Sequence, residues 1–125
     1  MTIDEALNVF DETRPNQHAR ALKVRWLGQL DWIIWRDCFA THEMPEDAPR
    51  EYAGYAHAAG ETVLLAPAPY DDMYLHYLAA ESDLVNGENA KYENDRLLFQ
   101  NVAEEYEKWF NRTYPPKYLR HTFTF

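Results

Sequence analysis

The sequence predicts a mostly α-helical protein, a small bundle built on a helical hairpin and one long helix that precedes it. Three observations support this fold class. Apolar residues recur at intervals of three, four and seven over residues 73–85 and 98–110, which is the spacing of one helix face. Residues 17–41 contain no proline and a single glycine. Turn-forming residues separate the helical segments, at 14–16, 42–61 and 86–87.

The composition is that of one folded domain. The chain has 125 residues, 46% of them hydrophobic, and this supplies enough apolar surface for a core without a metal or a disulfide. We expect a helical domain over residues 1–116 and an extended C-terminal tail over residues 117–125. The single cysteine, Cys38, has no partner within the chain and is expected to be a small buried hydrophobic residue.

A short helix is predicted at the start of the chain. Thr2 precedes Glu5 by three residues, the arrangement of a capping box that satisfies free amide hydrogens at a helix start. This helix is expected to end before Arg14 and Pro15, and Asn16 can cap the next one. Its core face consists of Ile3, Ala6, Leu7 and Phe10.

The long helix over residues 17–41 is apolar on more than one side. Its expected core face consists of Leu22, Trp26, Leu27, Leu30, Ile33, Ile34 and Cys38. Trp32, however, falls on the polar stripe with Arg25 and Arg36, and Trp35 lies near Asp31 on a neighbouring flank. Either the helix is central in the bundle, or a tryptophan contacts another subunit, where aromatic residues and arginine are enriched.

Residues 42–61 predict a loop, because they are rich in proline, glycine and acidic residues. Residues 62–65 form a short β-prone arm that ends at Pro67 and Pro69. Such an arm needs a partner strand, and the C-terminal tail is one candidate.

The hairpin is expected to begin at a cap formed by Asp71 or Asp72. A turn or kink follows at Asn86 and Gly87. A second, longer helix then runs to Pro115, with Glu104 and Lys108 as an ion pair. The first apolar stripe is Met73, Tyr74, Tyr77, Leu78, Leu84 and Val85, and the second is Leu98, Phe99, Val102, Tyr106, Trp109 and Phe110.

The tail alternates apolar and polar residues. Leu119, His121, Phe123 and Phe125 alternate with Tyr118, Arg120, Thr122 and Thr124. This pattern is compatible with three roles: pairing with residues 62–65, addition to another protein, or a frayed end.

No catalytic, cofactor-binding or metal-binding residue is predicted. The five histidines lack the spacing of a zinc site, and the four glycines form no phosphate-binding loop. Asp72 and His76 lie four residues apart, but a cap and an interfacial histidine explain them more simply. A formal net charge of −9 argues against binding DNA through its phosphates. The N-terminus has no signal-peptide pattern, and no apolar run is long enough to span a membrane.

Several motifs, in this order, resemble the small head-tail connector proteins (also called neck or adaptor proteins) of tailed bacteriophages and prophages. Those in the first half are Thr2-Ile3-Asp4-Glu5-Ala6-Leu7, Arg14-Pro15-Asn16 and Lys23-Val24-Arg25-Trp26-Leu27. Those that follow are Leu64-Leu65-Ala66-Pro67-Ala68-Pro69-Tyr70-Asp71-Asp72-Met73-Tyr74-Leu75-His76-Tyr77-Leu78, Asn86-Gly87-Glu88 and Trp109-Phe110-Asn111-Arg112-Thr113. The resemblance covers nearly the whole chain except residues 42–61 and the tail.

The resemblance implies a non-enzymatic structural protein of the virion neck that is assembled in the host cytoplasm. Such a subunit docks on the portal protein, forms a ring that extends the DNA channel, and receives a stopper or tail-completion protein. DNA would pass through the ring without specific binding. We expect Trp32, Trp35 and Arg36 to form the lateral contact between subunits. We expect the portal or another partner to dock on Tyr118, Leu119, Phe123 and Phe125.

An acidic inhibitor is the alternative prediction. A small protein that mimics DNA charge and occupies a nucleic-acid-binding protein would also carry a strong negative charge. Its acidic residues would cluster on one exposed face, whereas here they are spread over helix ends, helix exteriors and loops.

Overall fold

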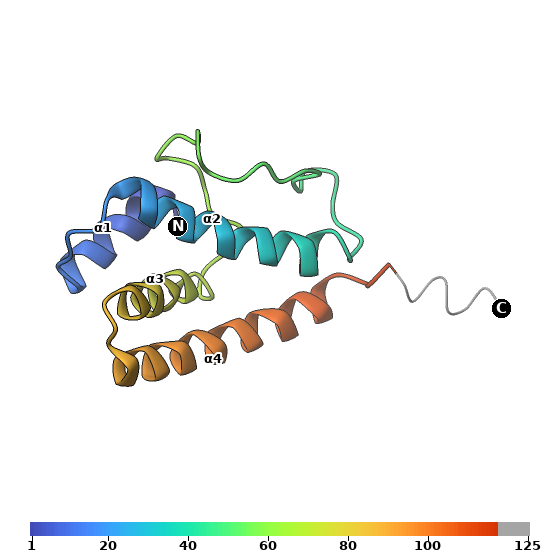
Figure 1. Ribbon diagram of the computed structural model, residues 1–125. Helices are drawn as coiled ribbons and strands as arrows, with labels where there is room; N and C mark the ends of the chain where they lie inside the picture. The colour runs from blue at the N-terminus through green and yellow to red at the C-terminus, as the bar shows by residue number, and fades with distance from the viewer. Residues whose placement is uncertain (118–125) are drawn as a thin grey trace.

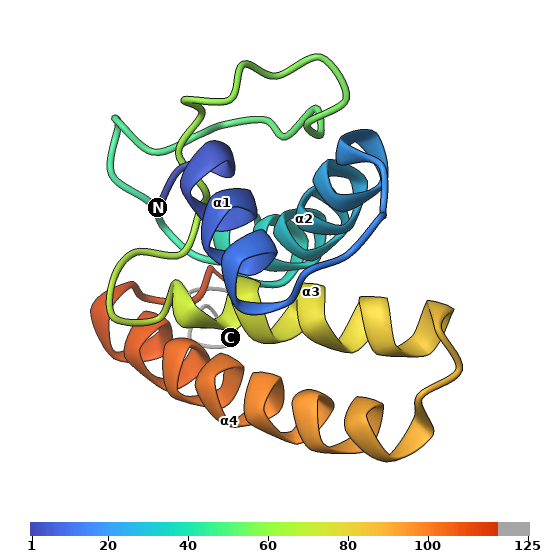
Figure 2. The same ribbon diagram turned by 90° about the vertical axis from the view of Figure 1, so that its left-hand side faces the viewer.

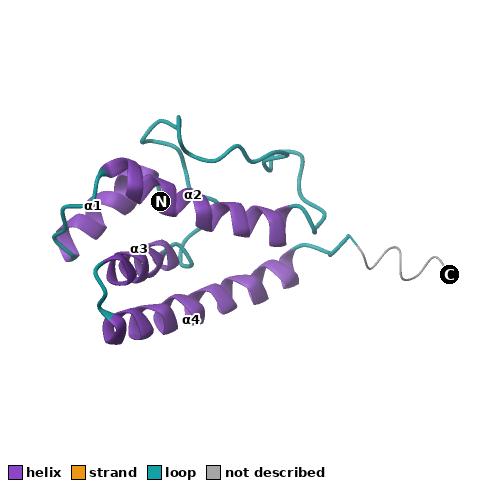
Figure 3. Ribbon diagram, viewed as in Figure 1, coloured by secondary structure: helices purple, strands orange, loops and turns teal. Residues whose placement is uncertain are grey.

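The computed structural model describes residues 1–117 and shows the predicted small helical bundle. The elements are α1 (Ile3–Thr13), α2 (Arg20–Ile34), the π-helical turn η1 (Trp35–Phe39), α3 (Asp72–Val85) and α4 (Asn89–Thr113). Helices α3 and α4 form the hairpin, and α1 and α2 lie on the other side of α3 (Figures 1 and 2). Residues 40–71 form a long loop that passes over α2 (Figure 3). None of the helices within residues 1–117 is both long and apolar enough to cross a membrane.

Helix α1 forms as its sequence predicts. The Thr2 hydroxyl accepts a hydrogen bond from the Glu5 amide at 3.1 Å, which satisfies one of the free donors at the helix start. Ile3, Leu7 and Phe10 are almost completely buried. The helix ends at Thr13, before Pro15 as expected.

Helix α2 begins later than predicted, at Arg20 rather than residue 17. The Asn16 side chain accepts a hydrogen bond from the His18 amide at 3.1 Å and therefore shapes the connecting loop instead of capping the helix. At the other end, the Ala40 amide bonds to the Trp35 carbonyl at 2.8 Å, so the last turn is π-helical. Cys38 is buried as predicted, but Ile33, predicted to be in the core, is 40% exposed.

The β-prone arm pairs with the N-terminus. The Ile3 amide donates to the Thr62 carbonyl and the Leu64 amide to the Met1 carbonyl, both at 3.0 Å, around an isolated antiparallel bridge between Thr2 and Val63. The arm is thus a single bridge in place of a strand, and its observed partner is the start of the chain. The tail residues that we considered as a partner lie outside the described residues.

The helix start predicted at Asp71 or Asp72 is confirmed, because Asp71 is the N-cap residue of α3 and Asp72 is its first residue. Asp71 precedes α3, but its side chain makes no capping hydrogen bond. Its carboxylate instead lies 3.6 Å from the amino group of Met1, and Asp72 is an exposed residue of the first turn. The turn at Asn86 and Gly87 is confirmed, with Gly87 at φ +71°, a conformation that favours glycine.

The hairpin core matches the predicted stripes except near the turn. Buried residues on both helices pack into one core that includes Met73, Tyr74, Tyr77, Leu78, Phe99, Tyr106 and Phe110. Leu84 and Val85 are instead 52% and 60% exposed, and Leu98 is 40% exposed. The predicted pair of Glu104 and Lys108 is also wrong, because Lys108 approaches Glu105 at 3.5 Å.

Candidate interaction surface

A large groove lies between α2 and the loop that covers it. Its volume is about 860 Å³, which is within the range of ligand and peptide sites. The lining is mostly apolar, with two arginines, Arg20 and Arg25, and no carboxylate among its residues. From α2 the lining includes Val24, Gly28, Gln29 and Trp32, and from the loop it includes Tyr52, Ala53, Tyr55, Ala56 and Ala58.

Two aromatic rings that line this groove, Trp32 and Tyr52, contact each other, and a third ring, Trp35, stacks on Trp32. Trp32 and Trp35, one helical turn apart, stack with 6.1 Å between ring centroids and 14° between planes. The ring centroid of Tyr52, which comes from the loop, lies 6.2 Å from that of Trp32. Trp32 remains 44% exposed, so a large apolar ring faces solvent at the edge of the groove.

Asp31 holds the outer wall of the groove in place from inside the protein. Its carboxylate is fully buried and accepts hydrogen bonds from the Tyr55 hydroxyl, from the Tyr74 hydroxyl at 2.6 Å and from the Leu65 amide at 3.0 Å. The Tyr74 hydroxyl also accepts from the Ala66 amide at 2.8 Å. One side chain therefore joins α2, α3 and both ends of residues 55–66.

Asp31 is buried, and no cationic side chain within residues 1–117 pairs with its carboxylate. Burial raises the pKa of Asp31, while the three hydrogen bonds to the charged form act in the opposite direction. A buried carboxylate without partners would be costly, so these donors are a condition for its presence in the core. This role of Asp31 was not predicted from the sequence. The available signal was the surplus of tyrosine, because a buried tyrosine hydroxyl usually finds a hydrogen-bond partner.

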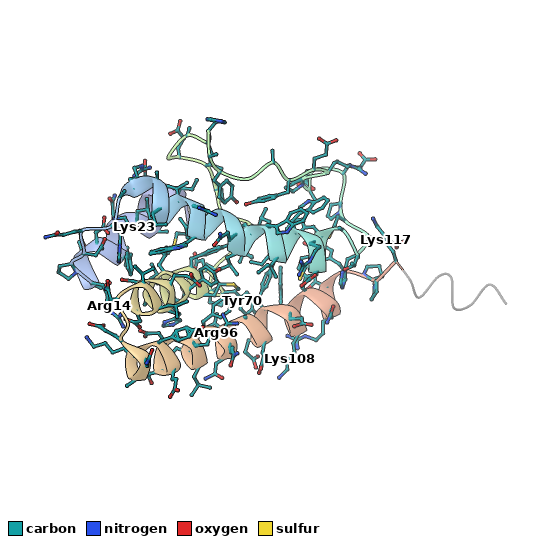
Figure 4. All side chains as sticks on the ribbon, viewed as in Figure 1. Arg14, Lys23, Tyr70, Arg96, Lys108 and Lys117 are labelled. Carbon is teal, nitrogen blue, oxygen red and sulfur yellow. The ribbon has the colours of Figure 1, made fainter. Side chains whose placement is uncertain are left out.

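A second polar cluster lies where the end of α1 meets the hairpin. The Arg14 guanidinium bonds to Asp83 at 2.9 Å and to Asp95 at 2.6 Å, and both carboxylates are buried (Figure 4 labels Arg14). Within residues 1–117, the second oxygen of Asp83 has no hydrogen-bond partner. Burial, together with the nearby Asp95, raises the pKa of Asp83 to about 6, although Arg14 acts against this shift.

A pair of side chains that resembles a catalytic pair lies beside this cluster. The His18 Nε2 atom is 2.9 Å from the Ser82 hydroxyl, a distance at which a base can activate a nucleophile. The His18 ring packs edge-on against Trp26, and within residues 1–117 no carboxylate forms a hydrogen bond with its other nitrogen. A catalytic triad needs that orienting group, so this pair fits a structural contact better. The described residues also contain no cluster of three or more side chains suited to hold a metal.

The structure brings together only part of the predicted site. Trp32 and Trp35 share one aromatic stack at the groove, while Arg36 is exposed and pairs with the adjacent Asp37 at 2.9 Å. Their predicted contact with another subunit stays a prediction. The docking residues Tyr118, Leu119, Phe123 and Phe125 lie outside the described residues.

Comparisons of the chain with protein-family models, with curated proteins and with solved structures gave no match.

Proposed function

We propose that this protein is a head-tail connector of a tailed bacteriophage or prophage. In this role it is a non-enzymatic virion protein that docks on the portal and forms a ring. The ring extends the DNA channel and receives the stopper or tail-completion protein. The sequence resemblance suggests this role, and the groove beside Trp32 supports it.

The groove is the observation that carries the proposal. Trp32 exposes a large ring at the edge of an open apolar groove, beside Tyr52 and Arg25, whose guanidinium has no ion-pair partner among residues 1–117. Tryptophan, tyrosine and arginine are the residues that most often dominate binding at protein interfaces. An isolated subunit gains little from such a surface, whereas a ring subunit can bury it against a neighbour.

The net charge of −9 agrees with a channel protein. A wall of negative potential repels the phosphate backbone, so packaged DNA can slide past without being held. A basic ring would instead bind the DNA that it must release.

The test is binding to the portal protein, which a connector function predicts to be encoded beside this chain. We expect the purified protein to form a stoichiometric complex with the portal, measured by light scattering of each protein alone and of the mixture. Replacing Trp32 by alanine should reduce the number of subunits bound per portal, because the lateral contact is lost. Replacing Leu97, which is 56% exposed on α4, is the matched control and should have no effect.

A chain that stays monomeric and ignores the portal would refute the proposal. If the same chain instead formed a complex with a nucleic-acid-binding protein and blocked its binding to DNA, the acidic inhibitor would be the correct function.

A further inference from the structure

The turn between α3 and α4 exposes two adjacent apolar side chains. Leu84 and Val85 are 52% and 60% exposed, although their spacing predicts that they belong to the core. We call residues 84–88 the hairpin tip. The tip projects at the end of the hairpin, on a different side of the molecule from the loop that covers α2 (Figures 1 and 2). The tip of one molecule therefore does not fill the groove of the same molecule.

The charges around the tip and the groove are opposite. Of the five carboxylates in residues 81–95, Asp83 and Asp95 are buried and bonded to Arg14, which leaves Glu81, Glu88 and Glu93 beside one lysine. The groove lining contains two arginines and no carboxylate, which is unusual on a chain with a net charge of −9. Arg20 bonds to Asp4, at the groove edge, but no such partner is found for Arg25 among the described residues. The groove is thus a surface to which an acidic copy of the same chain can bind with little repulsion.

We propose that the hairpin tip of one copy inserts into the groove of the next copy, with Leu84 and Val85 against the apolar lining and the acidic flank near Arg25. This inference rests on the proposed ring and names the two faces that meet in it. A contact between two different faces is heterologous, so it repeats head to tail and closes into a ring when the rotation allows.

The contact also gives a reason for the exposed residues on both faces. Burying an apolar side chain such as leucine or valine is favourable, and a monomer forgoes this gain when it leaves these side chains in water. In the ring, the tip fills the apolar groove and covers Trp32. This single contact then explains why Leu84 and Val85 on the tip and Trp32 at the groove are exposed in one subunit.

Disulfide trapping tests the contact directly. Leu84→Cys places a thiol on the tip, and Ala56→Cys places one in the groove wall. Both positions are exposed, and the natural Cys38 is buried with a pKa raised to about 12 by that burial, so it remains a protonated, unreactive thiol. We expect oxidation of the double variant to give a ladder of covalent oligomers. A mixture of the two single variants should stop at covalent dimers, because each copy then offers only one half of the contact.

The matched control replaces the tip thiol by Val9→Cys, on the exposed side of α1 at 37% exposure. If the Leu84 and Ala56 pair cross-linked no more than this control, the proposed contact would be wrong. Arg25→Glu should reduce the cross-linked fraction, and Glu88→Arg in the same chain should restore part of it.

The result is independent of the portal experiment. Portal binding without cross-linking above the control would refute the tip contact and leave the connector function standing. Cross-linking without portal binding would support the contact and refute the connector function.

Discussion

Asp31 is the residue on which the outer wall of the groove depends. Its buried carboxylate accepts hydrogen bonds from the hydroxyls of Tyr55 and Tyr74 and from the amide of Leu65. We predict that Asp31→Asn destabilises the protein by about 1–3 kcal/mol, because an amide offers one acceptor oxygen where the carboxylate offers two, and a buried donor loses its partner. Urea unfolding followed by circular dichroism measures this loss.

The same variant should loosen the loop. We expect faster proteolysis within residues 52–66 in Asp31→Asn, since its anchor to α2 is weakened. Asp37→Asn, at an exposed position of the following turn, is the control and should change neither quantity. Unchanged stability and unchanged cleavage in Asp31→Asn would show that the carboxylate does not anchor the wall.

Asp83 predicts a pH dependence with a defined sign. Its pKa is raised from the ordinary 3.8 to about 6, so the folded protein holds this proton more tightly than the unfolded chain. The contribution of Asp83 to stability is therefore present below pH 3.8 and is lost as the pH rises to about 6. Asp83→Asn resembles the protonated side chain. We expect it to gain stability relative to the natural protein between pH 4 and pH 7, measured by thermal unfolding.

The groups that face Asp83 set the controls for this measurement. Arg14 and Asp95 contact or flank the carboxylate, and His18 bonds to the adjacent Ser82. Histidine ordinarily titrates in the same pH range. His18→Gln should therefore retain the difference between the natural protein and Asp83→Asn. If the difference disappeared with His18, the histidine would be its source.

At the scale of the helices, two helix starts that look alike in the sequence should differ in energy. Thr2 caps α1 through a hydrogen bond to Glu5, whereas the Asp71 side chain makes no such bond at the start of α3. We predict that Thr2→Ala costs about 1 kcal/mol of stability. Asp71→Ala should cost less, because it loses only the 3.6 Å contact with the Met1 amino group. Chemical denaturation at equal ionic strength compares them, and a larger loss for Asp71→Ala would show that it acts as a cap.

Helical periodicity predicted the helices because their buried faces are mostly continuous. The core positions of α1 and the turn at Gly87 follow from spacing and from residue type alone. Leu84 and Val85 were wrongly predicted to be buried, because helical spacing does not show which side chains from other segments pack against the hairpin. Next to them in the chain, the buried position is taken by Asp83, which pairs with Arg14. Arg14 lies 69 residues earlier in the sequence.

The candidate site was only half predictable for the same reason. Trp32 was recognised as an exposed aromatic residue because it interrupts a polar stripe on a single helix. The groove needs a second wall, residues 52–58, and that wall is positioned through Asp31. An aspartate with tyrosine partners 24 and 43 residues away leaves no local pattern in the sequence.

At the scale of the whole molecule, the described part of the chain ends against the helical body. The last described residues are fixed near the end of η1, where the Lys117 amide bonds to the Thr41 carbonyl at 2.9 Å and Pro116 pairs with His42. Figure 4 places Lys117 at the end of the bundle opposite Arg14. The hydrogen bonds described above for the core and the groove join residues within 1–117.

Truncation after Lys117 should therefore separate folding from docking. We predict that the shortened chain keeps its helical circular dichroism and melts within about 4 °C of the full chain, the shift expected for about 1 kcal/mol in a domain of this size. Its binding to the portal should be lost, because Tyr118, Leu119, Phe123 and Phe125 are the predicted docking residues. Trp32→Ala, which keeps the tail, should instead bind the portal with fewer subunits. If truncation left portal binding unchanged, the docking residues would have to lie on the helical body. If truncation lowered the melting temperature strongly, the tail would be part of the fold.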